Sequence, residues 1–318
     1  MILKKWYKYY LLLFSINILG QECYDIKKGS MHRLQQDIIT LASDEMQGRE
    51  AGTAGEIKAR NYIITRMQEI GLDPKGTDGF IQTFSFVKKI GLKTIDVQAH
   101  NVLGFLDNGA QKTVVVTAHY DHLGFGGSGS KYFGRKEIHN GADDNASGTA
   151  ALLELAYLIK KNKIKEKNNF LFIAFSAEEK GLLGSRFFVT EPTIDIKKIN
   201  YVINMDMIGR MEDGMSLKIE GVGSSLVWEP YIREIECDAF PLSLKKRENG
   251  PSDHASFYEA DIPALHFWTG KHKDYHKPSD DSDKINFEGE SQIISFIESL
   301  IMLIDSKGEI NFHKRKIK

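Results

Sequence analysis

Apolar residues recur at helical spacing in four segments of the chain. Two of these segments, 31–43 and 56–70, lie near the beginning, one lies at 148–159, and one lies near the end at 289–305. In each segment the apolar positions fall three or four residues apart, which is the period of one helix face. Gly71 directly follows the second segment, where glycine commonly ends a helix. The pattern therefore predicts four amphipathic helices.

Short apolar runs between these helices predict strands. They are Val114–Val116, Phe170–Phe175 and Tyr201–Met205. Runs this short, rich in β-branched and aromatic residues, are typical of strands that are buried on both faces. Strands that alternate with helices indicate an α/β fold. We expect a single domain with a mostly parallel mixed sheet flanked by helices.

The first twenty residues have a different pattern from the rest. Three lysines precede an apolar run at 9–19, which ends at Gly20. A basic start, a short apolar stretch and a small residue are typical of a secretory signal peptide. The run is short for a transmembrane helix, although an uncleaved membrane anchor is the alternative. We expect a signal peptide at 1–20, one domain at 21–318, and an exported protein, periplasmic or secreted, with no stable membrane span after cleavage.

Composition and charge narrow the choice of partners. The 318 residues are 42% hydrophobic and 27% charged, an ordinary globular balance, and the net charge is -1. No overall field therefore favours binding to nucleic acid. The two cysteines, Cys23 and Cys237, make no disulfide framework, and we expect two free thiols, with one disulfide as the alternative. Neither has the spacing of a metal site, so a bound zinc ion would need histidine and carboxylate ligands.

Histidine and acidic residues directly follow the three predicted strands. His119 and Asp121 follow the first, Glu178 and Glu179 the second, and Asp206 the third. Each group alone would be explained by a surface pair or a helix cap. In an open parallel sheet, however, sites form outside the carboxyl ends of the strands. The three strands should therefore deliver these side chains to the same edge of the sheet.

Two polar clusters add further candidates. The run Gly141–Gly148 opens the predicted helix at 148, and its two adjacent aspartates and its asparagine exceed what one helix cap requires. The run Asp274–Asp280 places His276 in a polar loop that contains a proline. A lone loop histidine is usually structural, but the other candidate ligands still lack a nitrogen partner. His276 is therefore a candidate ligand as well.

Taken in order, these motifs resemble the co-catalytic zinc aminopeptidases, metallopeptidase family twenty-eight, and in particular the bacterial leucyl aminopeptidases. The matching segments are Gly48–Gly55, His119–His122, Gly141–Gly148, Ala177–Gly181, Asn204–Gly209, Ser252–His254 and Asp274–Asp280. Their order and spacing fit the family from about residue 31 to residue 305. The resemblance implies a zinc-exopeptidase fold of the phosphorylase/hydrolase-like kind, with 21–318 as the catalytic domain. It also implies peptide substrates with a free N-terminus, from which amino acids are removed.

The resemblance further implies two zinc ions per chain, held by five residues. One ion would be bound by His119, Asp144 and Asp206, and the other by Asp144, Glu179 and His276. Imidazole and carboxylate groups suit zinc, and each ion would keep an open position for water or substrate. Asp144 would bridge the two ions, and Asp143 is the alternative for this role.

Other matched residues would support the reaction. Glu178 would be the general base, and Asp121 would orient His119. Tyr275 would either donate a hydrogen bond to the developing oxyanion or pack as a core aromatic. Asp253, together with the neighbouring His254, would support the site without binding metal. The matched motifs give no role to His122, His139 and His266.

Two other functions stay open beside the aminopeptidase. One is a glutaminyl-peptide cyclotransferase, which has a related fold and uses one zinc ion to close an N-terminal glutamine into a ring. The other is a binding ectodomain that has lost catalysis, although all the candidate ligands and the base are present. The sequence leaves the oligomeric state and the side-chain preference undecided. Candidates for lining the specificity pocket are Phe257, Tyr258, Phe267 and Trp268.

Overall fold

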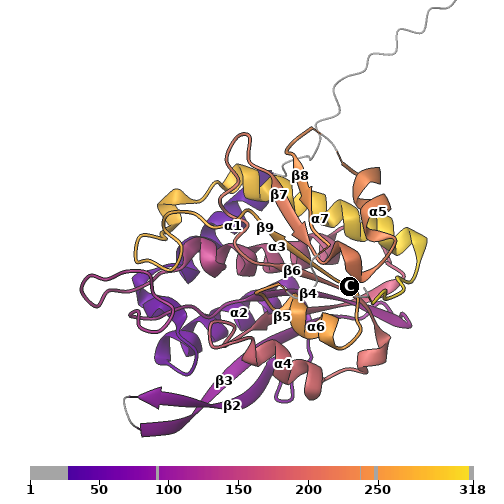
Figure 1. The fold of residues 1–318 in the computed structure, drawn as a ribbon. Helices are drawn as coiled ribbons and strands as arrows, with labels where there is room; N and C mark the ends of the chain where they lie inside the picture. The colour runs from indigo at the N-terminus through magenta and orange to yellow at the C-terminus, as the bar shows by residue number, and fades with distance from the viewer. Residues whose placement is uncertain (1–27, 91–92, 237, 247–249, 315–318) are drawn as a thin grey trace, which may run out of the picture.

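The computed structural model describes residues 28–314, apart from 91–92, 237 and 247–249 (Figure 1). The expected signal peptide at 1–20 and both cysteines fall outside the described residues, so the signal peptide, the domain division and the state of the thiols stay predictions. No helix within the described residues has the length and the apolar character that crossing a membrane requires.

The described strands form one nine-stranded mixed sheet, in the order β1-β3-β5-β4-β6-β9-β7-β8, with β2 paired to β3. The strands are β1 (Asp73–Pro74), β2 (Ile81–Ile90), β3 (Lys93–Leu106), β4 (Lys112–His119), β5 (Asn168–Phe175), β6 (Ile199–Met205), β7 (Leu217–Glu220), β8 (Leu242–Leu244) and β9 (Ala264–Trp268). Parallel pairing joins the central strands β5, β4, β6 and β9, and also β7 with β8. The pairs β1–β3, β2–β3, β3–β5 and β7–β9 are antiparallel.

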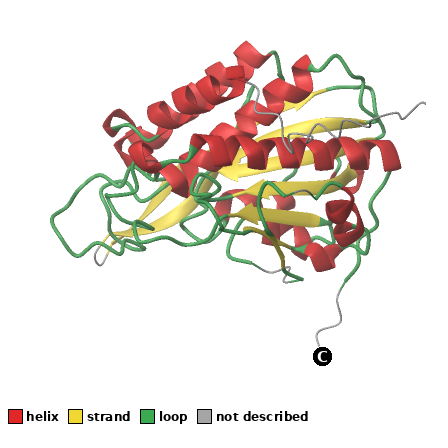
Figure 2. Cartoon of the chain, turned by 90° about the horizontal axis from the view of Figure 1, so that it is seen from above, coloured by secondary structure: helices red, strands yellow, loops and turns green. Residues whose placement is uncertain are grey.

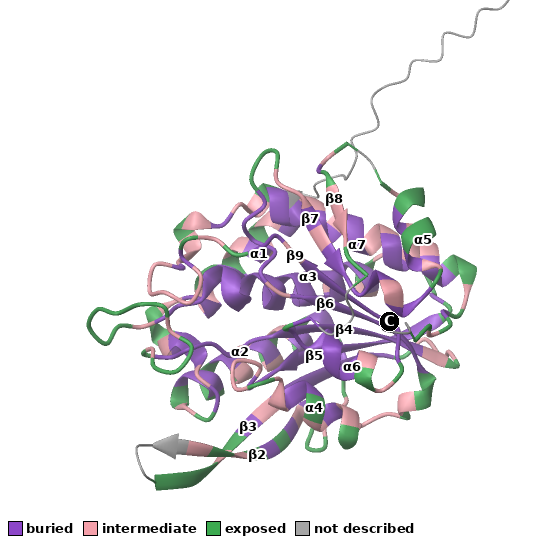
Figure 3. Ribbon diagram, viewed as in Figure 1, coloured by how far each residue is buried: buried purple, intermediate pink, exposed green. Residues whose placement is uncertain are grey.

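Helices cover both faces of the sheet (Figure 2). One face carries α1 (Lys28–Leu41), α2 (Ala54–Ile70), α3 (Gly148–Lys161), α5 (Trp228–Glu234) and α7 (Phe287–Lys307). The other face carries the shorter α4 (Leu183–Thr190) and α6 (His254–Glu259), which contribute Phe188 and Phe257 to the second core. The central strands β4, β5 and β6 are therefore buried almost throughout (Figure 3). Burial on both faces explains why their sequences are continuous apolar runs instead of alternating ones.

All four predicted helices and all three predicted strands are present, within a few residues of the expected bounds. Gly71 ends α2 with φ 88°, and its N–H donates to the carbonyl groups of Met67 and Gln68, as expected of a left-handed cap. The expected mixed α/β class is confirmed, with parallel pairing at its centre. The antiparallel edges contribute β2 and the first half of β3, which form an arm that projects beyond the helices (Figure 1).

Candidate metal centre

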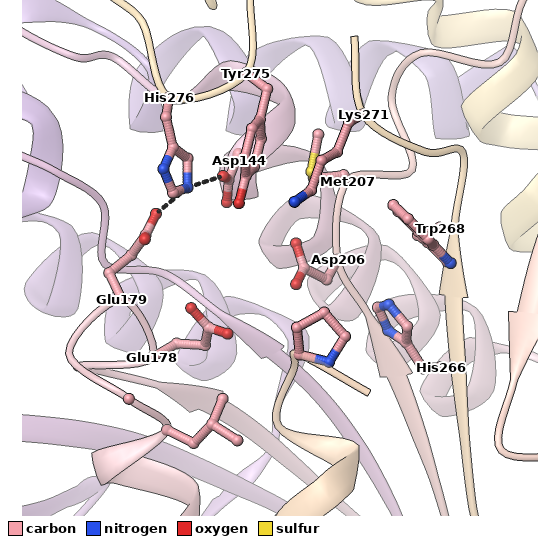
Figure 4. A pocket seen from close by; sticks show the side chains of 13 residues that line it. Asp144, Glu178, Glu179, Asp206, Met207, His266, Trp268, Lys271, Tyr275 and His276 are labelled. Carbon is pink, nitrogen blue, oxygen red and sulfur yellow. Dashed lines mark ion pairs between the residues drawn. The ribbon is translucent and has the colours of Figure 1, made fainter. Parts of the chain in front are cut away.

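The carboxyl ends of the central parallel strands lie side by side. In the sheet register His119, the last residue of β4, lies opposite Phe175, the last residue of β5. Thr117 of β4 lies opposite Asn204 of β6, so the ends of these two strands also align. The polar residues that follow each strand are therefore delivered to one edge, as the sequence predicted. The N-terminus of α3 and the loop that carries His276 meet them there (Figure 4).

Asp144 lies at the centre of the predicted ligands. Its Oδ1 lies 3.4 Å from Nε2 of His119, which also lies 3.4 Å from Oδ1 of Asp206. The other carboxylate oxygen of Asp144, Oδ2, lies 3.1 Å from Nε2 of His276. The same nitrogen of His276 lies 3.3 Å from Oε1 of Glu179 (Figure 4). The structure thus brings all five predicted ligands together, with Asp144 between the two histidines.

The structure also separates Asp144 from its neighbour Asp143. The carboxylate of Asp143 accepts a hydrogen bond from the N–H of Gly209 at 2.7 Å and lies 3.0 Å from Nε2 of His272. The hydroxyl group of Ser147 donates to it as well. Because these contacts occupy the Asp143 carboxylate, the geometry favours Asp144 over the alternative as the shared ligand.

His122 is a site residue that sequence reasoning missed. It is fully buried, and its Nδ1 lies 2.9 Å from Oε1 of Glu179. The same nitrogen is 4.0 Å from Oδ1 of Asp144, whereas Nε2 of His276 is close to both carboxylates. His276 also lines the cavity, and His122 does not. His122 therefore lies behind Glu179. The sequence feature that could have indicated His122 as a site residue is its position three residues after His119, in the same loop.

Backbone and side-chain contacts shape the turn that presents Asp144. Oδ2 of the buried Asp280 accepts hydrogen bonds from the backbone N–H groups of Asp143 and Asp144, at 3.0 and 3.1 Å. Oδ1 of Asn145 accepts from the N–H groups of Gly148 and Met207, at 2.9 and 3.1 Å. These contacts explain why this segment carries more aspartate and asparagine than one helix cap requires.

Arg49 ties several loops of the site together. Its guanidinium group is buried and donates to four carbonyl groups, those of Leu41, Tyr120, Asn140 and Gly141. Burial lowers the pKa of Arg49 to about 10, against the pull of nearby carboxylates. The group therefore stays charged at neutral pH. The sequence match at Gly48–Gly55 pointed to this segment but not to this role.

Asp121 links His119 to Glu178. Its Oδ1 accepts a hydrogen bond from the backbone N–H of Glu178 at 3.0 Å. Nδ1 of His119 lies 3.1 Å from the backbone carbonyl oxygen of Asp121 and 3.7 Å from its Oδ1. The predicted contact between Asp121 and His119 exists, and the backbone oxygen is the closer partner. Asp253 is buried near these residues, and burial raises its pKa to about 7.

The charges of the site are suited to a cation. Burial opposes a charge on His276, but hydrogen bonds with Asp144 and Glu179 outweigh it and raise the pKa of His276 to about 10. Nδ1 of His122 and Oε1 of Glu179 are buried without an aligned hydrogen bond in the described structure. Among the described residues two groups of donor atoms are close enough to share one ion, namely His119, Glu178 and Asp206, and His122, Asp144 and Glu179. Carboxylate oxygen and imidazole nitrogen are donors that zinc prefers, so the residues present fit this metal.

A cavity of about 360 Å³ opens over the ligands. Glu178, Tyr275 and Trp268 line it together with Lys271 (Figure 4). Burial raises the pKa of Glu178 well above its usual range, and repulsion from Asp206 and Glu179 adds to this shift against the pull of His119. The Tyr275 ring stacks on His276, with 3.8 Å between the ring centroids. Both predicted catalytic residues, Glu178 and Tyr275, therefore face the space where a substrate would bind.

The remaining candidates of the sequence analysis lie elsewhere or have other contacts. His266 lines the cavity, where burial lowers its pKa to about 4, and it stacks on His254. His139 lies against Ser130, with 2.7 Å between its Nε2 and the hydroxyl oxygen. Of the four expected pocket residues, Trp268 lines the cavity. The other three, Phe257, Tyr258 and Phe267, do not, and the first and last of these are core residues.

The α/β fold gathers this set of candidate metal ligands at the carboxyl edge of its sheet. Residues 101–300 match Peptidase family M28, so the chain belongs to this family. The family is the one that the sequence motifs resemble.

Two relatives match parts of this chain. Aminopeptidase YwaD of Bacillus subtilis is 34% identical over 187 residues, which cover 55% of this chain and 37% of YwaD. Leupeptin-inactivating enzyme 1 of Streptomyces exfoliatus is 26% identical over 261 residues, which cover 82% of this chain and 53% of that enzyme. The chain thus spans about half the length, or less, of these two relatives.

Solved structures of two activities share the fold. The zinc aminopeptidase BSAP of Bacillus subtilis superposes with a TM-score of 0.70 at 21% identity, covering 87% of this chain and 95% of BSAP. The Bacteroides thetaiotaomicron glutaminyl cyclase bound to N-acetylhistamine superposes with a TM-score of 0.68 at 16% identity, covering 87% of this chain and 99% of the cyclase. These likenesses confirm the predicted fold class, and because both activities occur on it, the fold does not choose between them.

Proposed function

We propose that this protein is a zinc aminopeptidase that hydrolyses the N-terminal peptide bond of peptides. The observation that carries the proposal is the position of Asp144, whose two carboxylate oxygens lie 3.4 and 3.1 Å from His119 and His276. Asp206 and Glu179 complete a ligand set on either side of it. Membership of Peptidase family M28 supports the same reaction.

Five residues would hold two zinc ions per chain. His119, Asp144 and Asp206 would bind one ion, and Asp144, Glu179 and His276 would bind the other. When bound, zinc supplies Lewis-acid chemistry, which polarises a carbonyl group and acidifies water. His122 would keep Glu179 in position from behind, because its ring contacts the carboxylate at 2.9 Å.

Glu178 would move the proton of the reaction. Its side chain lines the cavity beside the ligands, and its raised pKa makes it a better proton acceptor than an ordinary carboxylate. It would take a proton from the attacking water and pass it to the nitrogen of the leaving amine. The bond from the water oxygen to the carbonyl carbon would form first and leave an oxyanion, and the bond between that carbon and the nitrogen would break as the nitrogen takes up the proton. Tyr275 would donate a hydrogen bond to the oxyanion from the cavity wall.

The charge of the site suits a free N-terminus. The carboxylates near the cavity floor would attract the α-ammonium group of a peptide, which favours exopeptidase over endopeptidase action. Peptides with a free N-terminus are therefore the proposed substrates, and the near-neutral chain suggests no nucleic-acid partner. The expected signal peptide at 1–20 would export the enzyme, and sequencing the N-terminus of protein from the native host would test its cleavage.

Substrates with and without a free N-terminus test the proposal. Zinc-loaded protein should release p-nitroaniline from leucyl-p-nitroanilide and leave the N-acetylated substrate intact. A glutaminyl substrate should be hydrolysed without first forming a pyroglutamyl ring. Ring closure alone, with no hydrolysis in a panel of unblocked substrates, would identify a glutaminyl cyclase instead. If folded, zinc-loaded protein does neither, the binding-ectodomain alternative replaces the enzyme.

A further inference from the structure

Three lysine side chains surround the two aromatic residues at the cavity mouth. Nζ of Lys131 lies 4.0 Å from the ring centroid of Tyr275, and Nζ of Lys271 lies 4.7 Å from the same centroid. Nζ of Lys218 lies 5.0 Å from the ring centroid of Trp268. We call Lys131, Lys218 and Lys271 the lysine rim. Both rings line the cavity, and of the three lysines Lys271 lines it as well.

The lysine rim has no acidic partner. Among the described residues none of its three ammonium groups makes an ion pair, and Lys218 donates only to the carbonyl oxygen of Thr269, at 2.6 Å. Slight burial and repulsion from Lys271 and Lys277 lower the pKa of Lys131. The nearest acidic influences are longer-range ones, from Asp144 on Lys131 and from Glu220 on Lys218.

Some other lysines near the site are paired with carboxylates. Lys88 and Lys180 both contact the carboxylate of Glu50, at 2.6 and 3.1 Å. Lys284 lies 3.1 Å from Asp274. The lysines of the rim instead lie against the rings of Tyr275 and Trp268.

The surroundings of Lys271 indicate what the rim would bind. Lys271 is part of the cavity lining, and its side chain points into the space beside Met207 and Trp268 (Figure 4). The thioether and the indole ring provide apolar walls, and the ammonium group provides one positive end. A short apolar stem that ends in a carboxylate matches this combination, because the stem would pack on the walls and the anion would reach the lysine.

We propose that the lysine rim, with Lys271 as its main member, is a subsite for a substrate carboxylate close to the scissile bond, so that acidic peptides are preferred. This inference rests on the proposed aminopeptidase function. The carboxylate could belong to the side chain of the N-terminal residue. It could also belong to the second residue, as its side chain or as the C-terminus of a dipeptide.

Paired substrates that differ by one charge distinguish these sources. Glutamyl-p-nitroanilide against glutaminyl-p-nitroanilide tests the N-terminal side chain. Leucyl-glutamic acid α-amide against leucyl-glutamine amide tests the second side chain, and leucyl-alanine against leucyl-alanine amide tests the C-terminus. In at least one pair the acidic member should have the higher kcat/KM. Raising the salt concentration should reduce that preference, because exposed charges are screened.

Substitutions test the residues. Lys271→Met should lower the ratio of kcat/KM for the acidic member over its amide about tenfold, the scale of one charge-assisted hydrogen bond, and act mainly through KM. Lys161→Met is the matched control, since Lys161 is exposed at the far end of α3 and should leave the ratio unchanged. Lys271→Glu should reverse the preference in favour of basic substrates.

Two results would overturn the inference while leaving the aminopeptidase intact: equal rates for every acid–amide pair, or an unchanged ratio in Lys271→Met. Calorimetry with free L-glutamate, L-glutamine and the matching dipeptides gives a readout that is independent of turnover. Tighter binding of an acidic member, lost in Lys271→Met, would support the subsite even if no substrate were hydrolysed. No difference in binding between the acid and amide members of any pair would contradict the subsite in that case.

Discussion

Glu178 and Glu179 are neighbours in the chain, but their surroundings pull their pKa values in opposite directions. Burial raises the pKa of Glu178, and nearby carboxylates add to the shift. Burial acts on Glu179 in the same sense, yet attraction to the nearby rings of His122 and His276 outweighs it and lowers the pKa of Glu179. A charged carboxylate suits a metal ligand, and a carboxyl group with a raised pKa suits a proton carrier. The two proposed roles therefore follow from the contacts of each side chain.

Glu178→Gln should separate chemistry from metal binding. The amide has nearly the same shape but cannot accept a proton from water, so turnover should fall roughly 10²- to 10⁴-fold, the usual contribution of a general base. Zinc content and thermal stability should stay close to those of the unmodified protein. Steady-state kinetics and elemental analysis of the same preparation would measure both. Near-normal turnover would remove Glu178 from the mechanism.

Glu290 gives a prediction for the dependence of stability on pH. Its carboxyl group is fully buried in α7, with both oxygens lacking a hydrogen bond, and burial followed by repulsion from Asp143 raises its pKa well above the usual range. The folded protein therefore keeps this proton above about pH 4.3, where the unfolded chain loses it. The free energy of unfolding should fall as the pH rises from there towards the folded pKa, by up to about 1.4 kcal/mol per pH unit.

Glu290→Gln replaces this titratable carboxyl group by an amide that keeps no charge at any pH. Relative to the unmodified protein, the variant should gain stability as the pH is raised from 4 to 8, and denaturant unfolding at several pH values would measure the difference. The exposed Glu288, two residues earlier, supplies the control Glu288→Gln, which should show no such trend. A stability difference for Glu290→Gln that does not vary with pH would show that the buried carboxyl group does not titrate as described.

Buried apolar runs locate the strand ends and so pointed to His119, Glu179 and Asp206, whereas Asp144 and His276 entered the ligand set through the resemblance to the family. Sequence reasoning left Asp143 as the alternative to Asp144, because the two residues are adjacent and of the same type, so no sequence pattern distinguishes them. The contacts of Asp143 with Gly209 and His272 distinguish them in the structure. His122 was dismissed for a related reason. Its contact with Glu179 joins residues that are 57 positions apart in the chain, and no local pattern reports such a contact.

Among the helices and strands, those that are long or fully buried could be predicted from the sequence. The long helices α1, α2, α3 and α7 repeat their apolar face over several turns, and the central strands are continuous apolar runs, so both leave a clear pattern. The helices α4 and α6 have 8 and 6 residues, too few to repeat a face. The strand β3 is exposed in its first half and buried in its second. Its sequence is therefore neither a continuous apolar run nor a regular alternation of apolar and polar residues along its whole length.

The turn before α3 depends on an element that is far away in the chain. Asp280 accepts two backbone hydrogen bonds from this turn, so Asp280→Ala would leave two buried N–H groups without a partner. We expect a loss of stability of about 1–3 kcal/mol. We also expect zinc affinity to fall about 10- to 100-fold, the scale seen when a group that orients a ligand is removed.

Chelator competition and denaturant unfolding would measure these two effects of Asp280→Ala. Asp283→Ala is the control, because Asp283 lies three residues further along the chain and is exposed to solvent. It should change neither quantity. Unchanged zinc affinity in Asp280→Ala would show that the turn holds its shape without this carboxylate.

For the whole molecule, metal and stability should be linked. The site gathers Asp144, Glu178, Glu179 and Asp206 in one small volume, and without a cation these carboxylates repel one another. Removing metal with a chelator should lower Tm, and added zinc should restore it, since a ligand at 100 times its Kd stabilises by about 2.7 kcal/mol. Elemental analysis should find two zinc ions per chain. A Tm that is insensitive to chelator and zinc would contradict this ligand set.

The position of Arg49 has a consequence for the motions of the folded protein. Its guanidinium group joins the end of α1 to carbonyl groups of Tyr120, Asn140 and Gly141, on two separate loops. Loops usually open on their own, at a small fraction of the free energy of global unfolding. Here one loop cannot swing away unless several buried hydrogen bonds break together. Amide hydrogens of the turn at 142–144 should consequently exchange with solvent as slowly as those of the central strands, so the site opens when the core does.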